Sequence, residues 1–138
     1  MNFNPSPYIT GANCLICGSS HPHGNIFTCR TCGEQGILDL QYNYDNAATQ
    51  LKSQIQFRPQ NIWRYREFLP VSPDLHLPHL QIGWTPVYDI PRLAHALGLR
   101  KVFLKDDGRN PTNSFKDRAS AVGVMKAMEF RVRVVALA

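Results

Sequence analysis

The chain has 138 residues, of which 43% are hydrophobic and 18% charged, and these proportions exclude an intrinsically disordered tail. The formal net charge of +5 permits nucleic-acid binding, but the basic residues are scattered and form no stripe, so we expect no nucleic-acid partner. No apolar run is long enough to cross a membrane and no signal peptide begins the chain, so we expect a cytoplasmic protein without a membrane partner.

Residues 1–13 are polar, contain two prolines and are expected to be extended. Two Cys-x-x-Cys-Gly motifs follow, at residues 14–18 and 29–33. Each motif can place two thiolates on one ion, and its glycine permits a tight turn whose backbone N–H groups point at sulfur. The motifs predict a zinc ribbon over residues 1–44 with one closed structural zinc site, which leaves no position for water and does no catalysis. The predicted ligands are Cys14, Cys17, Cys29 and Cys32.

Other uses of these cysteines are two disulfides, four buried thiols or an iron ion in the same four-sulfur site. Disulfides fit poorly with a chain that lacks a secretion signal. His21 and His23 lie between the motifs and could replace a ligand, but with four cysteines present we expect both to be exposed loop residues. Phe27 and residues 37–40 are expected to form short strands of the ribbon. Four thiolates on one Zn²⁺ would reduce the net charge from +5 to +3.

A helical and proline-rich connector is expected over residues 45–82. Residues 45–56 carry apolar side chains at helical spacing, with Asp45 or Asn46 as the N-cap. A second helical stretch is expected over residues 61–68.

Trp63, in that second stretch, is expected to be a core anchor that could pack under the ribbon. Residues 71–80 contain three prolines and read as a linker. His76 and His79 lie in this linker, and we expect no metal site there.

An α/β domain is expected to begin at residue 83. Its predicted elements are a strand at 85–88, a helix at 90–99, a strand at 101–105, a helix at 115–130 and a strand at 132–138. The last segment is a continuous apolar run, which is typical of a strand buried on both faces. Strand, helix and parallel strand would form a right-handed βαβ unit.

The loop before the last predicted helix holds the most distinctive chemistry. Ser114 is suited to be the N-cap, and Asp117 could reach back to it as in a capping box. Lys116 would then lie in the first turn, where unpaired N–H groups and partial positive charge favour a neutral amine. A neutral lysine is a nucleophile that can form a Schiff base with a carbonyl such as that of pyridoxal phosphate. From charge alone, however, a solvated surface lysine is the commoner case.

Three segments resemble those of threonine synthases, which are fold-type II (tryptophan synthase beta-like) pyridoxal-phosphate enzymes. Residues 110–118, Asn-Pro-Thr-Asn-Ser-Phe-Lys-Asp-Arg, closely resemble the family's cofactor-lysine segment. Residues 83–86, Gly-Trp-Thr-Pro, resemble its Gly-x-Thr-Pro turn, and residues 63–67, Trp-Arg-Tyr-Arg-Glu, resemble its Trp-Arg-Tyr segment. The resemblance leads us to expect glycine at two positions that hold Asn113 and Ala119 in this chain.

The resemblance implies that Lys116 holds pyridoxal phosphate as a Schiff base and then acts as the proton-shuttling base, while Phe115 and Ser114 shape the cofactor face. The implied enzyme is a pyridoxal-phosphate-dependent lyase of threonine biosynthesis, which converts O-phospho-L-homoserine and water to L-threonine and phosphate. Its partner would be this small-molecule amino-acid substrate, and the parent could be a monomer or a homodimer. Four charged residues of the same loop are expected to have structural roles: Asp106, Asp107, Asp117 and Arg118.

Fold-type II enzymes have two α/β domains with the cofactor between them, so the resemblance implies an N-terminal fragment. The expected fold class is α/β, with the zinc ribbon at 1–44, the connector at 45–82 and the incomplete start of the catalytic domain at 83–138. We expect the fragment itself to be inactive, because Lys116 would lack the phosphate-binding loop and the second domain.

Two alternative functions stay open. One is another fold-type II enzyme, such as a cysteate synthase or an amino-acid dehydratase. The other is a zinc-ribbon binding module whose α/β remainder is a degenerate enzyme remnant.

Overall fold

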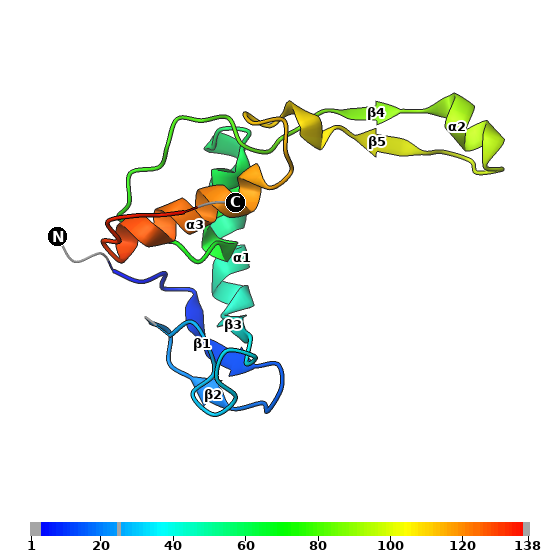
Figure 1. Cartoon of the computed structure of the whole chain (residues 1–138). Helices are drawn as coiled ribbons and strands as arrows, with labels where there is room; N and C mark the ends of the chain where they lie inside the picture. The colour runs from blue at the N-terminus through cyan, green and yellow to red at the C-terminus, as the bar shows by residue number, and fades with distance from the viewer. Residues whose placement is uncertain (1–3, 25, 137–138) are drawn as a thin grey trace.

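The chain folds into a three-stranded sheet, a group of helices and a projecting hairpin (Figure 1). The computed structural model describes residues 4–24 and 26–136. In chain order the strands and helices are β1 (Ile9–Cys14), β2 (Ser20–His21), β3 (Leu38–Tyr42), α1 (Tyr44–Gln54), η1 (Ile55–Phe57), η2 (Ile62–Phe68), β4 (Val87–Asp89), α2 (Pro91–Ala96), β5 (Phe103–Lys105), η3 (Asp107–Arg109) and α3 (Asp117–Glu129), where η marks a 3-10 helix. None of the helices in the described ranges is long and apolar enough to span a membrane.

The sheet has the order β2-β1-β3, and both pairings are antiparallel. Ala12 of β1 stands opposite His21 on one side and Leu40 on the other. The expected extension is correct for residues 9–13, which lie in β1, but residues 7 and 8 form a turn and residues 1–3 lie outside the described residues. The pairing of β1 in a sheet is not revealed by local composition. The strand expected around residues 37–40 is present as β3.

Two predictions in this region are wrong. His21 is not an exposed loop residue, because it lies in β2 opposite Ala12 and is only 8% exposed. Phe27 lies outside the strands, and its ring instead makes an edge-to-face contact with Phe130, at 5.6 Å between centroids. An aromatic side chain at the end of α3 gives Phe27 an apolar partner that a ribbon strand would not.

Helix α1 begins one residue earlier than expected. Its N-cap is Asn43 and not Asp45 or Asn46, because the Asn43 side chain accepts a hydrogen bond from Asn46 N at 3.1 Å. The Asn43 backbone N–H also donates to Tyr8 O at 2.8 Å, which ties the helix start to the sheet segment.

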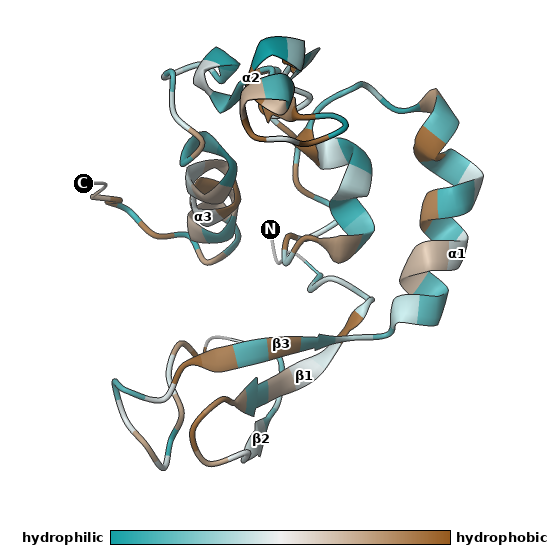
Figure 2. Ribbon diagram, turned by 90° about the vertical axis from the view of Figure 1, so that its right-hand side faces the viewer, coloured by the Kyte–Doolittle hydropathy of each residue, from teal (hydrophilic) through white to brown (hydrophobic). Residues whose placement is uncertain are grey.

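The core lies between η2, the linker and α3. Its buried side chains are Trp63, Val71, Leu75 and Met125. Trp63 is a core residue as expected, but the members of its buried cluster come from the linker and α3. The linker therefore contributes two core residues and is more than a spacer. In Figure 2 the helices lie on one side of the molecule and the sheet on the other.

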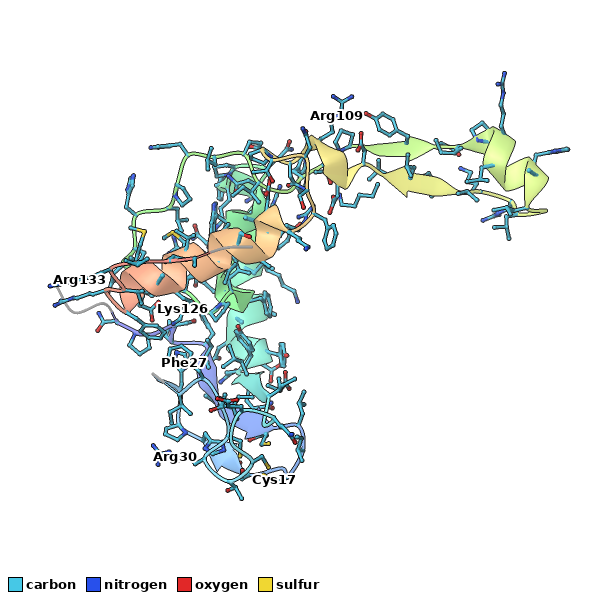
Figure 3. The ribbon with its side chains drawn as sticks, viewed as in Figure 1. Cys17, Phe27, Arg30, Arg109, Lys126 and Arg133 are labelled. Carbon is cyan, nitrogen blue, oxygen red and sulfur yellow. The ribbon has the colours of Figure 1, made fainter. Side chains whose placement is uncertain are left out.

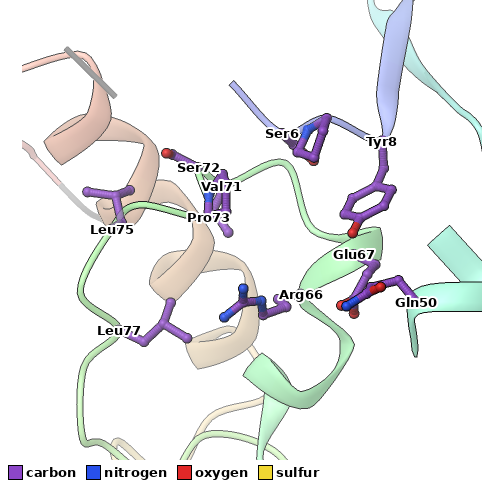
Figure 4. A pocket seen from close by; sticks show the side chains of 11 residues that line it. Ser6, Tyr8, Gln50, Arg66, Glu67, Val71, Ser72, Pro73, Leu75 and Leu77 are labelled. Atoms are coloured by element: carbon purple, nitrogen blue, oxygen red, sulfur yellow. The ribbon is translucent and has the colours of Figure 1, made fainter. Parts of the chain in front are cut away.

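A buried ion pair stabilises η2. Glu67, which is 1% exposed, accepts two hydrogen bonds from the Arg58 guanidinium. Burial raises the pKa of the Glu67 carboxyl, but the hydrogen bonds from Arg58 outweigh this effect and the pKa lies below its ordinary value. Figure 4 shows Glu67 beside Gln50, Tyr8 and Arg66 around a small cavity of about 70 Å³.

The hairpin of β4 and β5 is antiparallel, with Val87 opposite Lys105, and α2 closes its far end. In Figure 1 it projects away from the helices. The expected βαβ unit is not formed in the described residues, because residues 132–136 contain no strand. Val134 is 80% exposed, since no neighbouring strand in the described chain covers the apolar run. Residues 137 and 138 of the predicted strand lie outside the described residues.

Candidate cofactor and metal sites

The four cysteine sulfurs come together at one end of the sheet. Their Sγ atoms all lie within 4.8 Å of one another, and all four cysteines are free. Each motif closes a similar turn: Gly18 N donates to Cys14 O, and Gly33 N donates to Cys29 O, both at 2.9 Å. Both glycines have positive φ, +70° and +65°, which explains why glycine follows the second cysteine of each motif.

This cluster fits a metal ion. Zinc–sulfur bonds of about 2.3 Å in a tetrahedron put sulfurs about 3.8 Å apart, and the Sγ atoms of Cys17 and Cys29 are 3.7 Å apart. Backbone N–H groups of Ile16 and Thr31 donate to the sulfurs of Cys14 and Cys29, each at 3.4 Å. Four sulfur donors in this arrangement suit zinc, and iron shares the same ligand preference.

The pKa values of two of these thiols are shifted in opposite directions. A hydrogen bond with the Ser19 hydroxyl is the main cause that lowers the pKa of Cys29 to about 5. A hydrogen bond with Cys17 is the main cause that raises the pKa of Cys32 to about 12. Sulfurs this close cannot all carry negative charge without a cation, which is the charge that a bound metal would supply.

Three further histidines, His23, His76 and His79, lie outside the cysteine cluster. Burial is the main cause that lowers the pKa of His23, and the Lys126 ammonium adds to the effect. His76 and His79 stack edge to face, at 5.6 Å between ring centroids. Within residues 4–24 and 26–136, the only group of three or more metal-ligating side chains is the four cysteines.

Residues 106–116, which join β5 to α3 and carry Lys116, form the lysine loop. An ion pair that sequence spacing does not reveal holds this loop in place. The Arg118 guanidinium donates to both carboxylate oxygens of Asp107, from Nη2 at 3.0 Å and from Nε at 3.2 Å. The Thr85 hydroxyl donates to the same carboxylate. These hydrogen bonds, with that of Arg118 the largest cause, lower the pKa of Asp107 to about 2. The expected structural role of this aspartate and arginine agrees with these contacts.

The Gly-Trp-Thr-Pro turn docks on the same loop. Gly83 N donates to the Asn110 side chain at 2.9 Å, and Asn110, which is buried, donates through Nδ2 to Asp107 O at 2.8 Å. A Cβ at Gly83 would lie 2.6 Å from Nη1 of Arg118, and the residue has φ of +77°. Glycine therefore suits the positive φ of this turn, and a larger residue would also have to displace the end of the Arg118 side chain.

The Trp-Arg-Tyr segment reaches the turn as well. The guanidinium of Arg64 lies over the ring of Trp84, 4.3 Å from its centroid. Ile62 N donates to Ile82 O at 2.7 Å. The Gly-Trp-Thr-Pro turn thus contacts both of the other segments that resemble threonine synthases: the lysine segment through Asn110 and the Trp-Arg-Tyr segment through Arg64.

Lys116 directly precedes α3 and is not in its first turn, which corrects the predicted capping box. The Ser114 hydroxyl accepts from Lys116 N at 3.2 Å, but α3 begins at Asp117 with no side-chain cap. The Asp117 carboxylate accepts from the backbone N–H and hydroxyl of Thr112 instead of reaching Ser114. These bonds close the loop ahead of the helix.

Lys116 and Phe115 are both exposed, Phe115 by 66%. In the part of the chain that is described, the Lys116 ammonium has no hydrogen bond or ion pair. A lysine on a fixed loop without a carboxylate partner fits covalent attachment of an aldehyde cofactor. Figure 3 places Cys17 and Arg109, which lies in the loop region, at opposite ends of the molecule, so the two candidate sites are separate.

Comparison with known proteins agrees with this arrangement. Residues 79–138 match the family model of pyridoxal-phosphate dependent enzymes. Over most of its length the chain is similar to threonine synthases. That of Methanosarcina acetivorans is 36% identical over 91% of this chain and 30% of the relative, and that of Methanocaldococcus jannaschii is 37% identical over 91% and 31%.

The threonine synthase of Synechocystis is 42% identical over 51% of this chain and 19% of the relative. The chain thus spans about three tenths of the length of the two archaeal relatives. No solved structure matches the chain.

Proposed function

We propose that this chain is the N-terminal, lysine-bearing fragment of a cytoplasmic threonine synthase, whose reaction converts O-phospho-L-homoserine and water to L-threonine and phosphate. The observation that carries the proposal is that the Gly-Trp-Thr-Pro turn contacts both other family-like segments, through Gly83 and Asn110 and through Trp84 and Arg64. The chain is 36% and 37% identical to two threonine synthases over 91% of its length, which supports the substrate of a threonine synthase.

In this proposal Lys116 holds pyridoxal phosphate through its Nζ atom, with Ser114 and Phe115 beside it. The bound cofactor would withdraw electrons from the substrate carbons. Nζ of Lys116 would then take and return the proton at those carbons. Arg118 and Asp107 hold the loop that carries Lys116, and they would act through its position and not on the substrate.

Borohydride trapping tests the role of Lys116. When the protein encoded by the complete coding sequence is incubated with pyridoxal phosphate and reduced, peptide mass spectrometry should find the pyridoxyl group on Lys116 in preference to Lys101 and Lys105, which are exposed in this chain. Lys116→Ala should remove the modified peptide, whereas Lys101→Ala should leave it. Labelling spread evenly over the lysines would contradict the proposal.

Substrate choice separates the proposal from cysteate synthase or dehydratase activity. The protein encoded by the complete coding sequence should release phosphate from O-phosphohomoserine much faster than from O-phosphoserine. Failure on O-phosphohomoserine would exclude a threonine synthase.

We also propose that the four cysteines hold one structural zinc ion in a ribbon. The sulfur spacing and the N–H donors to sulfur support this. Metal analysis of the purified chain should find one zinc per chain. Less than that with intact thiols would contradict the site, while zinc without any lysine labelling would favour a binding module.

A further inference from the structure

We propose that Ser19 and His21 form a hydrogen-bond chain onto the cysteine sulfurs and set the affinity of the site for its metal. This inference rests on the metal site proposed above. It assigns a role to two side chains that supply no metal ligand.

Ser19 touches both cysteine motifs. Its Oγ lies 3.0 Å from Cys17 Sγ and 3.3 Å from Cys29 Sγ, so one hydroxyl faces a sulfur from each motif. Its carbonyl accepts a hydrogen bond from Cys14 N at 3.0 Å, which fixes the backbone of Ser19 against a third ligand residue.

His21 orients the hydroxyl. Its Nε2 lies 3.1 Å from Ser19 Oγ. The ring belongs to a buried residue of β2, and the sheet fixes its backbone through the pairing with Ala12. A Cβ at Gly11 would lie only 3.0 Å from His21 O, so β1 and β2 approach closely here and leave His21 little freedom.

The direction of the chain follows from the metal-bound state. A sulfur on a metal carries no proton and can only accept, so the Ser19 hydroxyl must donate to Cys17 or Cys29. The Ser19 oxygen is then free to accept from His21, which must carry its proton on Nε2. Two donors in series therefore point at the sulfurs.

Such donors matter because four thiolates around one divalent ion leave a net charge of −2 on the site. A hydroxyl donor spreads this charge and holds the ligand in place. Loss of a side chain of this kind typically costs about 10–100-fold in metal affinity.

Zinc affinity of the full chain, measured by competition with a chromophoric chelator, tests the inference. Ser19→Ala should weaken zinc binding by about 10–100-fold. Ser19→Thr, which keeps the hydroxyl, should bind as the wild type does. Ser20→Ala is the matched control, because the neighbouring Ser20 hydroxyl donates to Asn13 Oδ1 at 2.9 Å and not to sulfur.

The absorption of the cobalt-substituted site gives a second readout. Its sulfur-to-metal charge-transfer band should shift in Ser19→Ala but not in Ser20→Ala. For His21, the double variant Ser19→Ala/His21→Leu should bind zinc no more weakly than Ser19→Ala, because both changes break the same chain. Additive losses would show that His21 does not act through Ser19.

The outcomes distinguish this inference from the metal proposal. A wild-type chain that binds no zinc or cobalt would overturn both. A wild type that binds zinc, with Ser19→Ala equal to Ser20→Ala, would overturn the hydrogen-bond chain alone. Ser19→Thr as weak as Ser19→Ala would show that side-chain shape and not the hydroxyl matters, and would likewise overturn it.

Discussion

The two candidate sites differ in completeness: the described chain supplies all the groups that the cysteine cluster needs, but only part of those that a cofactor site needs. The cysteine cluster has all four candidate ligands, the N–H donors to sulfur and the Ser19 hydroxyl within one sheet region. The lysine loop is equally well fixed, by Asp107 and Arg118, but the side chain that would do the chemistry is exposed. A structural metal site can be completed by a short local sequence, whereas a cofactor site needs walls that exclude water.

The largest expected effect is complete loss of metal from the cysteine cluster while the helical core stays folded. Cys29→Ser should abolish stoichiometric zinc binding, because Cys29 is buried and is one of the four candidate ligands. The Trp63 core should persist, since its side chains come from η2, the linker and α3. Metal analysis and tryptophan fluorescence check the two expectations. Loss of the fluorescence signal of the folded core together with the metal would show that the two regions fold as one unit.

Changes on α3 should have the reverse effect. Met125→Ala should destabilise the chain by about 2–4 kcal/mol, because it leaves a cavity in the core. Met128, on the same helix, is 51% exposed against 2% for Met125, so Met128→Ala is a matched control with little expected effect. Denaturant unfolding measures both, and zinc content should not change in either variant.

Acid should weaken the lysine loop in a defined range. The pKa of Asp107 is about 2 in the folded chain, below the ordinary value of about 3.9 in an unfolded one. Its stabilisation is therefore fully present above about pH 4 and is lost as the pH falls towards 2. Thermal unfolding of the metal-free chain should show this loss, and Asp107→Asn should reduce the pH dependence in that range. An unchanged profile would exclude the ion pair as its cause.

The smallest effects concern Asn113 and Ala119, the two positions where the resemblance to threonine synthases predicts glycine. Asn113 has φ of +58°, so Asn113→Gly should be neutral or stabilise the loop by up to about 1 kcal/mol. Ala119 lies inside α3, where Ala119→Gly should cost about 1 kcal/mol. If the melting temperature falls in both variants, the positive φ of Asn113 does not strain the loop.

Local patterns predicted part of this structure well. Cysteine spacing anticipated the sulfur cluster, and apolar spacing found α1 and α3 with errors of a few residues. The capping predictions failed because short polar side chains have several backbone N–H groups within reach: Asn43 accepts from Asn46 N, and Asp117 accepts from Thr112 N. The predicted final strand failed for another reason: a buried strand is defined by its neighbours, and the described residues supply none for residues 132–136.

Contacts between distant segments were beyond local patterns. Arg118 and Asp107 are not spaced as neighbours on one helix, and nothing in the sequence pairs Gly83 with Asn110. The resemblance to threonine synthases marked these segments as a set but did not say that they touch. Burial of His21 likewise follows only from the pairing of β1 with β2.

The hairpin of β4 and β5 has a consequence for motion. All of its strand residues are exposed, and a two-stranded hairpin alone is only marginally stable in water. Its backbone amides should therefore exchange with deuterium early, while those of α3 near Met125 exchange late. The pairing at Val87 and Lys105 would thus open many times before the loop that carries Lys116 unfolds.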